Sequence, residues 1–118
     1  MKNNCAAVIH GYEHALDISE RMLGHAAGME WQKLIDLEHC YLREIDQLRS
    51  LDHQGMLEGE HLAYKKRILA RLLDNDRQLH RMLQQKLTEL SQLIDQNRTQ
   101  QQVNRAYGEV SHLARKSL

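Results

Sequence analysis

The clearest pattern along the chain is an apolar stripe between Leu62 and Ile94, a stretch with no proline and no glycine. Its members recur at steps of three, four and seven, which places them on one side of an α-helix, with Asp76 as the one polar gap. The stripe consists of Leu62, Leu69, Leu72, Leu79, Leu83, Leu87, Leu90 and Ile94. It predicts a helix over about residues 58–96, roughly 55 Å long at about 1.5 Å per residue. Such a helix spans a domain of this size, so other segments must cover its apolar side.

Two earlier segments carry the same helical spacing. Within about residues 5–26 the spaced positions are Val8, Tyr12, Ala15, Leu16, Ser19, Met22, Leu23 and Ala26, and Gly28 suits a C-cap. The second segment, opening at residues 29–31, places on one face Trp31, Leu34, Ile35, Tyr41, Leu42, Ile45 and Leu48. Residues 52–55 (DHQG) then have the composition of a turn. We expect these segments to form a hairpin against the long helix.

The end of the chain has a thinner apolar stripe. Residues 95–104 are rich in glutamine and asparagine and are expected to form a linker or a helix end. A short helix over about residues 103–114 has little to bury and is marginal alone, so it docks reversibly or waits for a partner. The chain is therefore predicted to be one all-α domain, residues 1–118. Its fold is an antiparallel bundle of three main helices plus a short C-terminal helix that folds back over the seam. A break of the long helix near Asp74–Asp76 is the alternative to one continuous helix.

Composition narrows the classes of partner and compartment. The 118 residues include 16 Lys and Arg and 16 Asp and Glu, so no net charge attracts nucleic acid or acidic lipid. The two cysteines, Cys5 and Cys40, fit reduced thiols better than a disulfide framework. The apolar run at residues 5–9 is too short for a signal peptide or a membrane span. We expect a cytoplasmic protein that does not insert into membranes.

Candidate chemistry along the chain is weak. His10 and His14 have a spacing that zinc uses, but no third ligand lies near them in the sequence. Residues 58–61 (EGEH) match the Glu-x-x-His pattern of di-iron bundles, but at a glycine-bearing helix start rather than in a core. No phosphate loop, nucleophile elbow or Cys-x-x-Cys pair is present. We expect neither an enzyme nor a bound metal or cofactor.

Charged residues on the predicted helices leave two further alternatives. Lys65, Lys66, Arg67 and Arg71 form a basic cluster that is either a solvated helix face or a docking patch for an acidic partner. Glu38 and Asp76 interrupt apolar stripes. Either they lie at the edges of the bundle, or they mark where it is left open for another chain.

Several blocks in a fixed order resemble the FliT family of flagellar type III export chaperones. They are Glu30-Trp31 with Leu34, Tyr41-Leu42 and Ile45; residues 73–76 (LDND); residues 83–91 (LQQKLTELS); and residues 104–108 (NRAYG). The likeness covers about residues 30–111. It implies a small cytoplasmic helical bundle that binds the C-terminal region of the filament-cap protein before export and keeps it unassembled. It also implies delivery to the export ATPase complex and the export gate, and restraint of the flagellar master regulator.

The pattern and the resemblance together suggest a binding site. We expect a client groove on the surface between the second and third helices, with candidate residues Leu69, Leu72, Leu73, Asp76, Leu79 and Leu83. The C-terminal helix, with Val103, Tyr107 and Val110, is expected to be a displaceable lid. The resemblance implies that Tyr107 docks at the export gate; alternatively, Tyr107 only holds the last helix on the long one.

A different class of protein also fits the long apolar stripe. The seam from Leu79 to Ile94 is close to a heptad repeat, so the chain is alternatively a structural or regulatory coiled-coil homo-oligomer without an export client. A homodimer is compatible with either reading.

Overall fold

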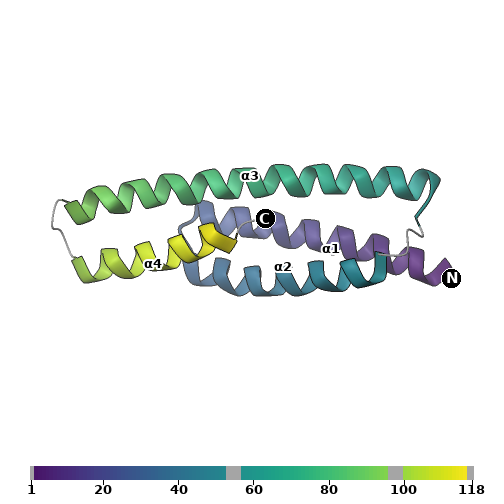
Figure 1. The fold of residues 1–118 in the computed structure, drawn as a ribbon, viewed down its shortest axis with the longest axis horizontal. Helices are drawn as coiled ribbons and strands as arrows, with labels where there is room; N and C mark the ends of the chain where they lie inside the picture. Colours follow the sequence, from purple (N-terminus) through teal and green to yellow (C-terminus); the bar gives the residue numbers. More distant parts are fainter. Residues whose placement is uncertain (1, 53–56, 96–99, 117–118) are drawn as a thin grey trace.

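Four helices make up the described part of the protein. The computed structural model describes residues 2–52, 57–95 and 100–116, with α1 at Lys2–Ala27, α2 at Trp31–Asp52, α3 at Gly59–Asp95 and α4 at Gln100–Lys116 (Figure 1). The predicted all-α class and helical bundle are confirmed. Of the turn predicted at residues 52–55, Asp52 is the last residue of α2, and the rest lies outside the described residues.

The length of α3 sets the shape of the molecule. α3 is one continuous helix of 37 residues that passes through Asp74–Asp76 without a break. The molecule measures 60 × 20 × 19 Å, with a radius of gyration of 17.3 Å. A compact chain of this length has a radius of gyration of about 13–14 Å, so the protein is a rod built along α3.

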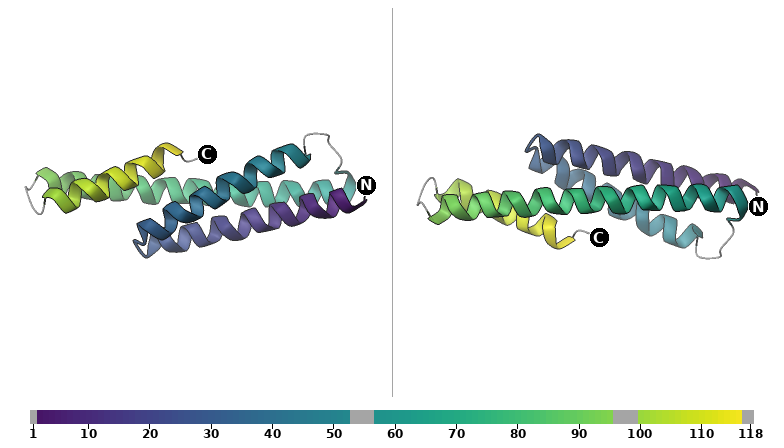
Figure 2. Two further views of the ribbon diagram at one scale, coloured as in Figure 1. Left: turned by 90° about the horizontal axis from the view of Figure 1, so that it is seen from below. Right: turned by 90° about the horizontal axis from the view of Figure 1, so that it is seen from above.

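The other helices cover different parts of α3. α1 packs against both α2 and α3, whereas α4 runs antiparallel along the C-terminal half of α3 and reaches α2 with its end (Figures 1 and 2). Within the described ranges, the backbones of α2 and α3 are not packed directly against each other. α1 is therefore the central helix of the first half of the rod, and α2 and α3 flank it.

Small side chains on α1 allow this close packing. Ala15 and Ala26 are buried, and so is the small polar Ser19. At Gly11 an added Cβ would collide with the side chain of the buried Leu48, so α2 approaches α1 at a position without a side chain. The rest of the buried apolar core consists of Val8, Tyr12, Ile18, Met22, Leu34, Tyr41, Leu48, Leu57, Ile68, Leu72, Leu79, Leu83, Leu90, Val110 and Leu113.

The turn between α1 and α2 is closed by backbone and side-chain bonds. The backbone N–H of Glu30 donates to the carbonyl of His25 (2.9 Å), and that of Met29 donates to the carbonyl of Ala26 (3.1 Å). This is the hydrogen-bonding pattern of a Schellman motif, in which the residue after the C-cap takes a left-handed conformation. That residue is Met29, with φ of 57°. The predicted C-cap Gly28 is thus the neighbour of the strained position and does not occupy it.

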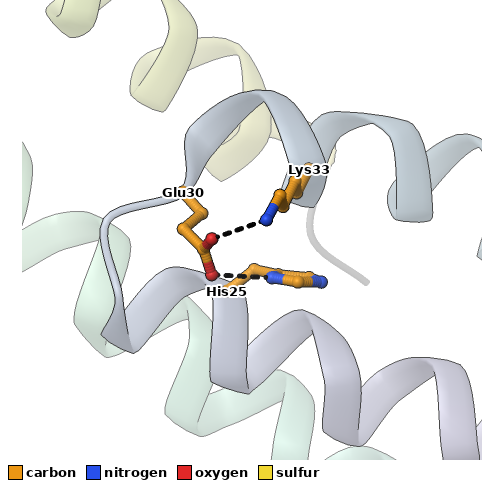
Figure 3. Close-up of polar contacts among 3 residues, drawn as sticks. All are labelled: His25, Glu30 and Lys33. Atoms are coloured by element: carbon orange, nitrogen blue, oxygen red, sulfur yellow. Dashed lines mark hydrogen bonds and ion pairs between the residues drawn. The ribbon is translucent and has the colours of Figure 1, made fainter.

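Side chains reinforce the same turn (Figure 3). His25 Nδ1 lies 3.0 Å from Glu30 Oε1, and Lys33 Nζ donates to Glu30 Oε2 at 2.9 Å. The hydrogen bonds from Lys33 and His25 hold the pKa of Glu30 below its ordinary value. These contacts fix the angle at which α2 leaves α1.

The basic cluster on α3 joins the helices to one another. Arg71 pairs with Glu20 on α1 at 2.6 Å. The Tyr64 hydroxyl donates to Glu13 at 2.6 Å, and the Arg67 guanidinium lies over the Tyr64 ring. Each exposed pair contributes little alone, but Arg71 is engaged with α1 and Lys65 pairs with Asp52 at the end of α2, so half of the cluster is tied to other helices.

The C-terminal helix is longer than predicted. α4 begins at Gln100, so part of the expected linker at residues 95–104 is helical. Glutamine is a good helix former, and packing along α3 supplies the stability that the sequence of α4 lacks by itself. None of the described helices is both long and apolar enough to cross a membrane.

Candidate binding groove

An open apolar groove lies where α2 and α3 flank α1. It encloses about 210 Å³ and is lined by Tyr12, Tyr41, Ile45, Leu48, Arg49, Leu69, Leu72 and Leu73. We call it the α2–α3 groove. Tyr12 comes from α1, the helix that packs on both neighbours, and α2 and α3 supply the other residues. The groove lies where the backbones of α2 and α3 both pack on α1 but do not approach each other.

Leu73 is the most solvent-accessible leucine of this groove. It is 54% exposed, whereas Leu72 beside it is buried and Leu69 is half-buried. A large apolar side chain that remains exposed next to an apolar hollow is typical of a surface that another chain covers. The three leucines therefore form one wall, from its base at Leu72 to its rim at Leu73.

The predicted groove residues divide into two sets. Leu69, Leu72 and Leu73 line the α2–α3 groove. Leu79 and Leu83 are buried and belong to the C-terminal half of α3, along which α4 lies. α1, whose end lies beside Met82, and α4 together cover most of the seam from within the chain, whereas Leu73 on the groove wall stays exposed.

Asp76 lies next to the Tyr41 end of the groove. Burial raises the pKa of Tyr41 to about 12, and the nearby Asp76 carboxylate adds to this rise. Asp76 is half-buried, and Glu38 on α2 is only 5% exposed. Glu38 is therefore not an edge residue, because α2 turns this position inward together with Leu34 and Tyr41, which are also buried.

A polar cluster fixes the other end of the groove. The Tyr12 hydroxyl donates to Asp52 Oδ2 at 2.6 Å, Lys65 pairs with the same oxygen, and the Lys65 ammonium lies over the Tyr12 ring. Burial alone would raise the pKa of Asp52, but the bonds from Lys65 and Tyr12 outweigh it and lower that pKa. This cluster joins α1, the end of α2 and α3 at one point.

The sequence analysis placed the groove between the second and third helices but named no residue of α1 or α2 in it. Tyr12, Ile45 and Leu48 have helical spacing and were expected in the core, where their partial access from solvent cannot be predicted. Arg49 had no signal beyond its position next to Leu48. These residues become accessible because the backbones of α2 and α3 both pack on α1 and stay apart from each other, which the sequence pattern does not reveal.

The predicted residues of α4 differ in how deeply they are buried. Val110 is fully buried, whereas Tyr107 is 37% exposed. The Val103 side chain lies outside the described part of the structure. Val110 and Leu113 supply the buried contacts of α4. The Tyr107 ring keeps an exposed surface that a partner can cover. None of the α4 side chains that the structure describes lines the α2–α3 groove, although the end of α4 reaches α2.

The described histidines do not assemble a metal site. His14 faces Glu44 across α1 and α2 at 3.2 Å, and His10 lies 3.5 Å from Glu13 on its own helix. Among the residues that the structure places, no three His, Cys, Asp or Glu side chains come together in a way that would hold a metal ion.

Comparisons with known proteins agree on one family. The family model described as "Flagellar protein FliT" matches residues 9–109, which begins earlier than the resemblance read from the sequence. A curated "Flagellar protein FliT" of Photorhabdus laumondii is 32% identical over 110 residues, covering 91% of this chain and 86% of the relative. Proteins of the same description from Yersinia pestis and Yersinia pseudotuberculosis are 33% identical over 98 residues, covering 83% of this chain and 82% of each relative. No solved structure matches the chain.

Proposed function

The chain belongs to the flagellar protein FliT family, and on that premise we propose that it is a cytoplasmic flagellar type III export chaperone. Its client is the filament-cap protein, whose C-terminal region lies in the α2–α3 groove before export. There it is kept unassembled until delivery to the export ATPase complex and the export gate. The observation that carries this proposal is the open apolar groove with Leu73 exposed at its rim.

The physical basis is helix-in-groove recognition. An amphipathic helix of the client buries its apolar face on leucine and tyrosine side chains that the free chaperone leaves accessible to water. Each buried aliphatic side chain contributes about 1.5–3 kcal/mol when it is fully removed from water. The client's own apolar face is covered at the same time, which prevents premature assembly.

α4 is proposed to act as a lid and as a docking element. A client helix longer than the groove would continue along α3 onto the half that α4 covers, so α4 competes with the client for that surface. Tyr107 is proposed to dock at the export gate, because a partly exposed aromatic ring on a thinly packed helix is an efficient anchor. Restraint of the flagellar master regulator would use the same apolar surfaces and compete with the client.

The homo-oligomeric coiled coil is the less favoured alternative. The leucines that would pair between copies, Leu79, Leu83 and Leu90, are already buried within one chain. Self-association through this seam requires that α4 first be displaced.

Calorimetric titration of the C-terminal segment of the filament-cap protein tests the proposal. The variant is Leu73→Asp, which changes an exposed groove residue and leaves the core intact. The matched control is Leu51→Asp, which changes a leucine that is 43% exposed and lines a different hollow between α1 and α2. Loss of at least about tenfold in affinity for Leu73→Asp alone supports the groove. Equal affinities for both variants and the wild type would show that the client binds elsewhere.

A further inference from the structure

Among the described residues that line the α2–α3 groove, Arg49 is the one charged residue. The other seven are leucines, an isoleucine and two tyrosines. Arg49 is exposed and lies one turn beyond Ile45. A long basic side chain at such a position covers apolar surface with its stem and keeps its charged end in water. Across the described ranges, no carboxylate lies within ion-pairing distance of the Arg49 guanidinium.

Two acidic residues of α2 lie one turn from Arg49. Asp52 accepts bonds from Tyr12 and Lys65 at this end of the groove, and the exposed Asp46 forms no ion pair with Arg49. Within the described part of the chain, the Arg49 guanidinium is therefore not held in an ion pair. A guanidinium is a fork of donors that matches a carboxylate, often with two parallel hydrogen bonds.

At the opposite end of the groove, the charged neighbour is an acidic residue. Tyr41 lies eight residues before Arg49, about 12 Å along α2 at about 1.5 Å per residue. The charge of Asp76 acts on Tyr41 there. An acidic side chain of a partner is therefore favoured at the Arg49 end, because the described lining residues offer it no basic side chain at the Tyr41 end.

We infer that the groove selects an amphipathic helix that carries a carboxylate at the position meeting Arg49, and that this pair sets the direction in which the helix lies. The inference rests on the proposed function and adds the chemistry of the bound segment. Two turns of helix match the distance between the two ends of the groove. Apolar residues at steps of three, four and seven would contact Ile45, Leu72 and Leu73, while one acidic residue at the edge of that stripe reaches Arg49.

Charge reversal at Arg49 tests this inference on the full chain. The C-terminal segment of the filament-cap protein is titrated into the wild type, Arg49→Glu and Arg49→Lys at about 50 mM and about 300 mM salt. The matched control is Arg43→Glu, because Arg43 is an exposed arginine of the same helix outside the groove lining. We expect Arg49→Glu to weaken binding about tenfold at the lower salt, and Arg49→Lys to stay within about threefold of the wild type. The loss caused by Arg49→Glu should shrink at the higher salt.

A scan of the client locates the partner carboxylate. Each acidic residue of the segment is replaced in turn by lysine, and one replacement should restore binding to Arg49→Glu while weakening binding to the wild type. If Arg49→Glu binds like Arg43→Glu, or if no replacement restores binding, the inference is wrong. In that case, weak binding by Leu73→Asp would show that the groove itself still holds the client. Absence of binding by the wild type would instead contradict the proposed function and, with it, the inference.

Discussion

Tyr12 and Asp52 are joined by a hydrogen bond of 2.6 Å, although forty positions separate them in the sequence. The bond ties the first helix to the last residue of α2, and Lys65 of α3 pairs with the same carboxylate oxygen. Three helices thus meet at one carboxylate, whose side chain is only 6% exposed. The α2–α3 groove begins directly beside this junction, since Tyr12 belongs to both.

The first prediction concerns the stability of this junction. Asp52→Asn removes the charge that pairs with Lys65 and leaves the Lys65 ammonium without its partner carboxylate. We expect a loss of about 2 kcal/mol in the free energy of unfolding at neutral pH, measured by urea denaturation. Asp17→Asn is the control, because Asp17 forms an exposed pair with Arg21 and should cost less than about 0.5 kcal/mol. Equal costs for the two variants would contradict the structural role of Asp52.

The same junction makes the stability of the fold depend on pH. The pKa of Asp52 is lower in the folded chain than in the unfolded chain, where an aspartate titrates near 3.9. The stabilisation is therefore present above about pH 4 and lost as the pH falls through the pKa of the folded state. The wild type should lose its advantage over Asp52→Asn below about pH 4. A difference that persists unchanged in acid would mean that the carboxylate charge is not its source.

The second prediction concerns the turn between α1 and α2. Met29 has a φ of 57° and its side chain is 59% exposed, so it carries backbone strain and little packing. Met29→Gly removes that strain and should raise the free energy of unfolding by about 0.5–1 kcal/mol. Met29→Ala keeps the backbone strain and should not raise the free energy of unfolding. Thermal or urea unfolding of the two variants separates the relief of backbone strain from a simple effect of side-chain size.

The third prediction concerns the attachment of α4. Val110 is fully buried, so Val110→Ala should cost about 2 kcal/mol and speed amide exchange along α4. Because α4 is the proposed lid, this loosening should also raise the affinity for the filament-cap segment. Faster exchange with unchanged affinity would leave α4 as a packed helix but contradict its role as a lid.

The fourth prediction concerns Tyr107. Tyr107→Ala should weaken binding to the export gate by at least about tenfold while leaving the affinity for the filament-cap segment unchanged. The exchange rates of α4 amides provide the control, since Val110 and Leu113 remain to hold the helix. If those amides exchange faster in parallel with the loss of gate binding, Tyr107 is an internal anchor of α4 and not a docking residue.

The three main helices were predictable because each carries a long apolar series that a single residue cannot disturb. The long series in α3 specified its length, and Asp76 did not interrupt the helix because one polar residue at a half-buried position costs less than breaking the helical hydrogen bonds. The start of α4 was misplaced because the glutamines at residues 100–102 have no apolar periodicity, although their helix propensity is good.

The groove was only half predictable. Leu69, Leu72 and Leu73 follow from the periodicity of α3, since a seam that wide exceeds what one neighbouring helix covers. Tyr12, Ile45 and Leu48 look like ordinary core positions, and whether such residues line a hollow depends on how far α2 stands from α3. That distance is set by the packing of both helices on α1, through contacts between residues far apart in the sequence.

The most direct test of the groove is a nuclear magnetic resonance titration of the leucine methyl groups with the filament-cap segment. We expect the methyl signals of the groove leucines to shift first and most, namely those of Leu48, Leu69, Leu72 and Leu73. The signals of Leu51 and Leu23 should stay in place. Shifts confined to Leu51, or to residues of α4 with the groove leucines unchanged, would contradict the placement of the client in the α2–α3 groove.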